Sequence, residues 1–334
     1  MNNFWDKHNI LITGADGFIG SHLTERLVSL NANVTALTYY NSRGSNGWLD
    51  NIYETIPDNL LIKQGDIRDS YFIDSIIGDN TTVFHLSSLI AIPYSYTAYQ
   101  SYIDTNITGL ANLLTSCKRN NIKKIVHTST SEVYGSALYT PIDEKHPLQG
   151  QSPYSASKIA ADMIADSFFR SFDLPITTAR PFNTFGPRQS IRAVIPAVIQ
   201  QLLNKKNGDF LDIGDITPRR DFNFVSDTVD GFLSLGASDK VLGNVYNIGS
   251  GIDVSIKELC DILFDISGKR LNYRVDKKRI RPQKSEVNRL LCDSSLIKET
   301  TGWQSKINLY DGLKTTYDWF KSNSDQYGKE TFLL

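Results

Sequence analysis

The chain has 334 residues, of which 40% are apolar, and its formal net charge at pH 7 is −1. That length suits two packed lobes, and the near-neutral charge gives no broad basic surface for nucleic acid or an anionic membrane. No apolar run approaches the roughly 18 residues that cross a bilayer, and the polar first residues leave no room for a signal peptide. The three cysteines form no metal-like spacing. We therefore expect a cytoplasmic globular protein with no metal, nucleic-acid partner or membrane segment.

Short apolar strands alternate with amphipathic helices in the first half of the chain. Strands are predicted at residues 10–13, 33–38, 60–64, 82–86, 124–128 and 176–179. Helices are predicted at residues 18–30, 71–77, 97–120 and 153–171. This alternation is typical of a parallel sheet with helices on both faces, so we predict a doubly wound α/β (Rossmann) fold. Later strand pieces at residues 209–213, 245–248 and 271–275 predict a smaller mixed α/β lobe.

Three glycines, Gly14, Gly17 and Gly20, follow the first predicted strand. In a turn from strand to helix, the first permits the tight turn and the second lets the backbone approach a pyrophosphate. The third lets the helix and strand pack closely, and the first helical amides then face the phosphates. The turn could serve packing alone, but its position directly after an apolar strand favours a dinucleotide site that includes Phe18 and Ile19.

The ends of the next strands bear on which dinucleotide binds. An acidic residue at the end of the second strand accepts hydrogen bonds from the adenosine ribose and favours NAD, but Thr38 has that position. Arg43 could bind a 2′-phosphate, so NAD is preferred and NADP stays open. Asp66 and Ile67 are placed to grip the adenine edge, although Asp66 could act only as a strand-end cap. The fourth strand end adds Leu86 and Ser87 to the predicted cofactor site.

Tyr154 and Lys158 are four residues apart in a predicted helix and therefore share a face. A phenol has a pKa of about 10 and must ionise nearer 7 to act as a base, which requires about 4 kcal/mol. One positive charge at about 4 Å supplies roughly that amount at an effective dielectric constant of about 20. Lys158 is therefore expected to activate the phenol, and it could also hold the nicotinamide ribose. Together with the glycine-rich turn, the pair predicts an enzyme that oxidises an alcohol carbon, at least transiently.

A run of hydroxyl groups and one carboxylate follows the fifth predicted strand, from Ser129 to Glu132. Ligands bind at the carboxyl ends of the strands in a doubly wound sheet, so these side chains are candidates for the reaction site. Thr130 is expected to donate a hydrogen bond to the reacting oxygen. Glu132 is either a base beside the substrate or a loop carboxylate paired with a cation.

These motifs resemble the extended short-chain dehydrogenase/reductase family, specifically the branch that acts on nucleotide sugars. Segments 179–188, 219–227, 281–282 and 302–303 carry the same resemblance. It implies a Rossmann domain at residues 1–185 with a return segment at about 221–240, and a nucleotide-sugar-binding lobe at residues 186–334. It also implies a homodimer formed through paired helices of the large lobe.

The resemblance further implies roles for individual residues. Thr130, Tyr154 and Lys158 correspond to the catalytic group, and Pro181 to a nicotinamide contact. Arg220 and Arg281 correspond to clamps on the diphosphate of the substrate, although either could instead be a solvated surface charge. The residues implied to bind the nucleotide-sugar substrate are Asn183, Arg192, Arg220, Arg281 and Glu286.

Within this branch the chain looks most like 4,6-dehydratases, in particular the N-acetylglucosamine nucleotide dehydratases of legionaminic-acid-type pathways. Such an enzyme would convert GDP- or UDP-N-acetylglucosamine, or a related hexose, to the 4-keto-6-deoxy sugar. The steps would be C4 oxidation, loss of water across C5 and C6, and hydride return to C6. Well-known glucose-nucleotide dehydratases carry Asp-Glu after the threonine, whereas this chain has Ser131-Glu132. Glu132 would then carry the C5 proton to the C6 oxygen, or a water would help.

Three other functions stay open at this point. A nucleotide-sugar 4-epimerase needs only Tyr154, Thr130 and rotation of the sugar. A UDP-glucuronate decarboxylase is also possible, because such enzymes resemble this chain in having Ser-Glu at the position of Ser131-Glu132. A dinucleotide fold kept as a redox-sensing binding module is the non-enzymatic alternative, but such proteins usually lack the tyrosine and lysine that are present here.

Overall fold

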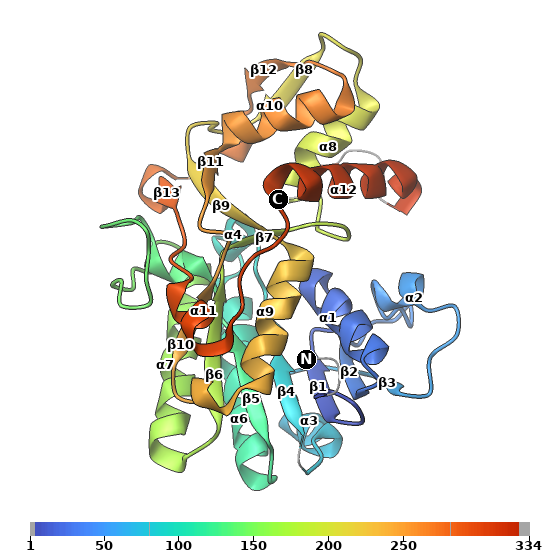
Figure 1. Cartoon of the computed structure of the whole chain (residues 1–334), viewed down its shortest axis with the longest axis vertical. Coiled ribbons are helices and arrows are strands. Elements are labelled where there is room, and N and C mark those ends of the chain that lie inside the picture. The colour runs from blue at the N-terminus through green and yellow to red at the C-terminus, as the bar shows by residue number, and fades with distance from the viewer. Residues whose placement is uncertain (1–3, 80, 281, 327–334) are drawn as a thin grey trace.

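The structure is a computed structural model that describes residues 4–79, 81–280 and 282–326. A large lobe is built on a parallel sheet, and a smaller lobe lies beyond the carboxyl ends of its strands (Figure 1). The strands of the large sheet are β1 (Asn9–Thr13), β2 (Asn33–Tyr39), β3 (Leu60–Gly65), β4 (Thr82–His85), β5 (Lys124–Thr128), β6 (Ile176–Pro181) and β10 (Val245–Ile248).

The seven strands lie in the order β10-β6-β5-β4-β1-β2-β3, and every pair is parallel. The chain moves from β1 outward to β3 and then returns past β1 to β4. This reversal opens a crevice at the carboxyl ends of β1 and β4, where doubly wound sheets bind ligands. The predicted α/β fold is therefore confirmed.

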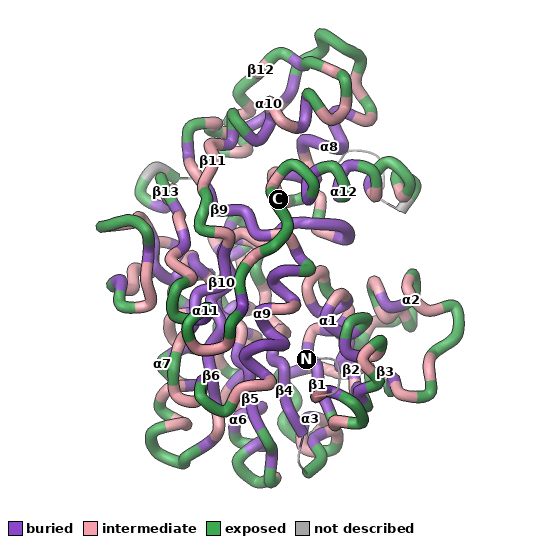
Figure 2. The backbone as a smooth tube through the Cα atoms, in the orientation of Figure 1, coloured by how far each residue is buried: buried purple, intermediate pink, exposed green. Residues whose placement is uncertain are grey.

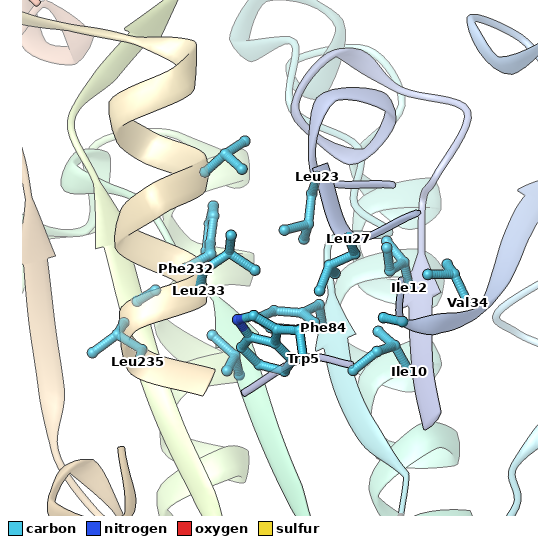
Figure 3. Close-up of a cluster of buried hydrophobic side chains, with 14 of the residues drawn as sticks. Trp5, Ile10, Ile12, Leu23, Leu27, Val34, Phe84, Phe232, Leu233 and Leu235 are labelled. Atoms are coloured by element: carbon cyan, nitrogen blue, oxygen red, sulfur yellow. The ribbon is translucent and has the colours of Figure 1, made fainter. Parts of the chain in front are cut away.

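Helices cover both faces of the sheet because neighbouring strand residues point to opposite sides. Ile10 and Ile12 pack with one buried cluster, and Leu11 packs with the other. Figure 3 shows Trp5 and Phe84 in the first cluster, between the sheet and its helices. That face carries α1 (Phe18–Ser29), α9 (Val225–Ala237) and α11 (Ser295–Thr301), and the other carries α3 (Ser70–Ile76), α6 (Gly109–Arg119) and α7 (Pro153–Phe172). Figure 2 shows that burial is concentrated in the strands and α9.

One predicted strand belongs to a different lobe from the one expected. The sequence predicts residues 245–248 in the smaller lobe, but β10 pairs with β6 and forms an edge of the large sheet. Conversely, β9 (Arg219–Phe224) lies outside the large sheet, although the expected return segment begins at about residue 221. The return to the large lobe is made by α9, which packs against α1 and β5 and so delivers the chain to the edge next to β6.

The single helix expected at residues 97–120 is divided into three parts. These parts are α5 (Tyr99–Tyr102), a π-helical segment (Ile103–Thr108) and α6. Asn106 in the wider turn is buried, accepts a hydrogen bond from the Leu89 amide, and donates to Ser157 of α7. The π turn therefore ties the segment after β4 to the helix that carries Tyr154. Two further short helices are α2 (Leu49–Ile52) and α4 (Ile92–Ser95).

The smaller lobe packs three helices against two short sheets. In one sheet β9 pairs with three strands, and in the other two strands pair in parallel. Its separate apolar cluster includes Leu202, Leu259 and Leu313 from the three helices. The helices are α8 (Val194–Asn204), α10 (Ile256–Ser267) and α12 (Leu309–Ser322), and the remaining strands are β7 (Asn183–Phe185), β8 (Phe210–Ile213), β11 (Asp253–Ser255), β12 (Asn272–Val275) and β13 (Arg289–Leu290).

Gly20 allows β1 and α1 to approach closely, and its replacement tests this packing. A Cβ atom at Gly20 would lie 2.0 Å from the Gly14 carbonyl oxygen. We expect Gly20→Ala to lower the free energy of unfolding by about 3 kcal/mol or more, because the backbone must move apart. At Gly78 the nearest atom to an added Cβ is the Thr81 hydroxyl, 3.7 Å away, so Gly78→Ala should change stability little. Equal denaturation midpoints for the two variants would contradict this expectation.

Candidate active site

The glycine-rich turn lies at the crevice between β1 and β4. Gly14 has φ of 70°, and a Cβ atom there would lie 2.9 Å from the Ser87 amide nitrogen. Gly17 is exposed and precedes α1, whose first turn contains no acidic side chain. Phe18 and Ile19 begin that turn, where backbone amides have no partner within the helix. A dinucleotide pyrophosphate fits the turn between β1 and α1. The glycines have no side chains where the phosphates must approach, and the amino end of the helix favours anions.

Thr13, which the sequence analysis did not select, joins the turn to the end of β4. Its hydroxyl lies 2.8 Å from His85 Nδ1 and accepts hydrogen bonds from the amides of Leu86 and Ser87, each at 3.1 Å. The backbone at Leu86 and Ser87 is therefore held against Gly14, as expected for residues of one site. A buried hydroxyl residue at the end of the first strand was the available signal in the sequence.

The residues predicted at the adenosine end are less closely grouped. Thr38 is fully buried, and its hydroxyl has no partner among the described residues. Ile67 packs in the core beneath Gly109, so its side chain does not face the crevice, and only its backbone is left for a ligand. Asp66 binds the Arg68 guanidinium at 2.9 and 3.0 Å, and these hydrogen bonds lower the pKa of its carboxyl. Arg43 lies exposed in the loop after β2.

Helix α7 brings the catalytic candidates together at the carboxyl end of β5. The helix begins with a capping box between Ser152 and Ser155, which fixes the position of Tyr154 in the first turn of the helix. The phenol of Tyr154 is hydrogen-bonded to Thr130 and lies within electrostatic range of Glu132. The Thr130 hydroxyl also accepts a hydrogen bond from the Glu132 amide at 3.2 Å.

Lys158 and Ser131 complete the predicted catalytic group and are both buried. The Lys158 ammonium donates hydrogen bonds to the Ser88 hydroxyl at 3.0 Å and to the Thr128 carbonyl at 2.7 Å. Ser88 was not identified from the sequence, where nothing distinguished it from other loop serines. Two of the three donors of Lys158 are therefore used by the protein, and they fix the direction of the third.

The electrostatics of the tyrosine oppose the lowering of its pKa that is expected from Lys158. Burial raises the pKa of Tyr154, and the charge of Glu132 raises it further, while the hydrogen bond with Thr130 acts in the opposite direction. Burial also lowers the pKa of Lys158 to about 8, against the charge of Asp162. The sequence did not predict that the side chains of both Tyr154 and Lys158 are buried. Activation of the phenol therefore requires positive charge beyond that of Lys158.

The pKa of Lys158 predicts how activity depends on pH. The ammonium is charged below about pH 8 and loses its proton above that value, so kcat/KM should fall as the pH rises through about 8. Lys158→Arg should move this fall to higher pH, because a guanidinium stays protonated. Initial rates measured from pH 6 to 10 at low substrate concentration provide the test. A fall at the same pH in both proteins would assign it to another group.

A buried polar network supports the strand end that carries Thr130. Asp162 lies one helical turn beyond Lys158, accepts from the Ser129 hydroxyl at 2.9 Å, and is bound by Arg180 at 2.8 and 3.1 Å. His127 Nε2 lies 3.3 Å from the same carboxylate. The hydrogen bond with His127 and the charge of Arg180 hold the pKa of the Asp162 carboxyl low despite burial. An acidic residue four positions after Lys158 was the sequence signal for this network.

The predicted substrate residues line a cavity of about 530 Å³ between the lobes. Arg220 is buried and donates to a Glu286 carboxylate oxygen at 3.0 Å, and Asn183 donates to the Asp221 carbonyl at 3.3 Å. Arg192 lines the same cavity, whereas Pro181 is buried at the end of β6. Arg281, predicted as a second clamp, lies outside the described residues.

The far wall of this cavity comes from the large lobe. Tyr96 lines it and lies with its hydroxyl 2.7 Å from that of Ser285, on the segment that follows residue 281. Both lobes therefore enclose the cavity, and Tyr96 also packs against the apolar cluster that contains Tyr154. Within residues 4–79, 81–280 and 282–326, no helix is both long and apolar enough to cross a membrane. Over the same ranges, no cluster of three His, Cys, Asp or Glu side chains is placed to hold a metal ion.

The fold and the tyrosine–lysine pair define an enzyme of the extended short-chain dehydrogenase/reductase class. A family model described as GDP-mannose 4,6 dehydratase matches residues 11–316, and the chain belongs to this family. Both the resemblance seen in the sequence and the enzymatic function are thereby confirmed.

Relatives include both dehydratases and epimerases. A dTDP-glucose 4,6-dehydratase of Actinoplanes sp. is 32% identical over 94% of this chain and 98% of its own. The crystal structure of DesIV, a dTDP-glucose 4,6-dehydratase from Streptomyces venezuelae with NAD bound, has a TM-score of 0.86 at 26% identity, covering 96% and 98% of the two chains. A UDP-N-acetylglucosamine 4-epimerase from Methanobrevibacter ruminantium has a TM-score of 0.85 at 30% identity, covering 95% and 99%. The protein is thus a member of the nucleotide-sugar dehydratase and epimerase superfamily.

Proposed function

We propose that the protein is an NAD-dependent nucleotide-sugar 4,6-dehydratase whose substrate is GDP- or UDP-N-acetylglucosamine or a related hexose nucleotide. The observation that carries the proposal is the position of Glu132. Glu132 follows the Thr130 hydroxyl that its amide binds, and its charge acts on the Tyr154 phenol. An exchange of configuration at C4 alone needs no such second base. The family match and the Actinoplanes dehydratase support the same reaction.

In this proposal each catalytic residue acts at a stated atom. Tyr154 takes the proton of the sugar 4-hydroxyl, and Thr130 donates a hydrogen bond to the same oxygen. Glu132 removes the C5 proton, which the neighbouring C4 ketone makes acidic, and delivers it to the departing C6 hydroxyl. C5 takes up a solvent proton when hydride returns to C6. The bound nicotinamide supplies reversible hydride acceptance, and Lys158 and the glycine-rich turn are the residues that would hold the dinucleotide. The cofactor is NAD, as in the solved DesIV dehydratase.

The nucleotide end of the substrate is proposed to bind in the cavity between the lobes. Arg220 would turn from Glu286 to the diphosphate, because a planar guanidinium suits two phosphate oxygens. Glu286 would then be free to accept hydrogen bonds from the nucleoside ribose, with Asn183 and Arg192 on the same wall. Residues 186–334, without the return through α9 and β10, would thus form the nucleotide-sugar lobe. Binding of a remote nucleotide orients a sugar that must react at three carbons.

We also propose a homodimer that acts in the cytoplasm. Tyr99 and Ile103 are exposed beside α6, and Met163 is exposed on α7, so apolar side chains are present on the helices that would pair. Three buried, unpaired cysteines suit a reducing compartment.

The 4-epimerase is the second candidate, because the Methanobrevibacter epimerase matches this chain as well as the dehydratases do. Mass spectrometry separates the two after incubation with NAD and a panel of GDP- and UDP-sugars. A dehydratase gives a product lighter by one water, whereas an epimerase gives a product of unchanged mass with inverted C4. Release of carbon dioxide from UDP-glucuronate would instead indicate a decarboxylase.

A further inference from the structure

A carboxylate lies at the end of β2 although β2 itself does not provide one. Asp16 belongs to the glycine-rich turn after β1, and its Oδ2 accepts a hydrogen bond from the Tyr39 amide at 3.3 Å. Tyr39 is the last residue of β2. The side chain of Asp16 therefore reaches from the neighbouring strand to the position where an acidic residue of β2 would contact the adenosine ribose.

The loop after β2 holds Asp16 in this place. The Trp48 amide donates to the Asp16 carbonyl at 3.2 Å. Gly47 approaches so closely that a Cβ atom there would lie 2.8 Å from Asp16 Cβ. Asp16, Gly47, Trp48 and Asn51 line an open groove of about 400 Å³. The carboxylate is thus only partly buried, and a ligand in the groove can reach it.

The charge of Asp16 is compatible with this role. Burial raises the pKa of its carboxyl, and the hydrogen bond from Tyr39 opposes that rise. A hydrogen bond donated by a backbone amide favours the ionised form of a carboxyl group, as the Tyr39 amide does here. Ribose hydroxyls donate hydrogen bonds to such a group, whereas a 2′-phosphate would place like charges in contact.

We propose that Asp16 contacts the adenosine ribose and makes the site selective for NAD against NADP. This inference rests on the proposed function, since it presumes that the crevice binds a dinucleotide. It assigns to Asp16 the role that Thr38 cannot fulfil, because Thr38 is buried and carries no charge. Arg43, in the same loop, would have the opposite effect and favour the 2′-phosphate.

The test measures dinucleotide affinity rather than activity. Equilibrium dialysis of the full-length protein against NAD and NADP gives the ratio of the two dissociation constants. Asp16→Asn keeps an oxygen that can accept from Tyr39 but removes the charge, so we expect NADP to bind about tenfold tighter or more. NAD affinity should fall only slightly. Asp58→Asn removes an exposed charge just before β3, at the amino ends of the strands and away from the crevice, and should leave both constants unchanged.

Two results would overturn the inference. One is an unchanged NADP-to-NAD ratio in Asp16→Asn, or in Asp16→Ser if the asparagine variant does not fold. The other is a wild-type protein that prefers NADP and loses that preference in Arg43→Ala, which would make Arg43 the selecting residue. A wild-type protein that binds neither dinucleotide would instead contradict the proposed function, so the two failures are distinguishable.

Discussion

Tyr154→Phe should lower turnover by about 10³-fold, because it removes only the oxygen that takes the proton of the sugar 4-hydroxyl. The phenyl ring remains, so its edge contact with Tyr102, at 6.2 Å between ring centroids, is kept. NAD affinity should therefore stay close to wild type, while loss of the hydrogen bond with Thr130 should reduce stability by about 1 kcal/mol. Product formation followed by mass spectrometry, at saturating substrate and NAD, measures the loss.

Tyr102→Phe is the matched control for this variant. Tyr102 is a buried tyrosine of the same apolar cluster, but its hydroxyl donates to the Ala91 carbonyl and not to Thr130. Loss of that hydrogen bond should reduce stability by about 1 kcal/mol and leave turnover nearly unchanged. If Tyr154→Phe kept more than a tenth of wild-type turnover, the phenol would not be the base at C4, and the mechanism would need another group.

The parts of the site that depend on local spacing could be predicted from the sequence. Gly14 and Gly20 follow β1 by a fixed number of residues, and their close contacts result from that short turn. Tyr154 and Lys158 share a helical face because of the helix period alone. The parallel sheet followed from the alternation of strands and helices, since parallel strands require crossover connections.

The parts that depend on distant pairing could not be predicted. Asp162 forms an ion pair with Arg180, which lies on another element. Arg220 forms an ion pair with Glu286, although the two are separated by 66 positions in the chain. The resemblance predicted Arg220 and Glu286 as substrate contacts but gave no sign that they bind each other. The pKa of Tyr154 depends on burial by α4, α5 and α7 together, which no local pattern reports.

The place of β10 shows the same limit for topology. A four-residue apolar run is compatible with either lobe, and only the packing of α9 on the large sheet decides between them. Asp16 is a further case. It follows β1, and its carboxylate accepts a hydrogen bond from Tyr39 at the end of β2, a strand that lies beside β1 only in the folded sheet. The sequence therefore predicted which local motifs are present, while the fold determines which charged side chains lie next to those motifs.

Glu132→Gln should abolish the loss of water and leave chemistry at C4 intact. Glutamine has the same shape but cannot take the C5 proton, so formation of the 4-keto-6-deoxy product should fall by about 10²- to 10⁴-fold. The charge of Glu132 raises the pKa of Tyr154, and its removal should therefore make the phenol easier to ionise. Loss of dehydration in this variant cannot then be explained by a weaker base at C4.

Deuterium exchange identifies which proton transfer Glu132 performs. In D₂O the wild-type enzyme should give a product with deuterium at C5. If Glu132→Gln shows neither C5 exchange nor water loss, Glu132 is the base at C5. Exchange without water loss would restrict it to protonation of the leaving hydroxyl, where Ser131 offers no acid and is itself buried. Glu144→Gln, which keeps an acceptor for the Asn247 amide, is the control, and an epimerase would retain full turnover in Glu132→Gln.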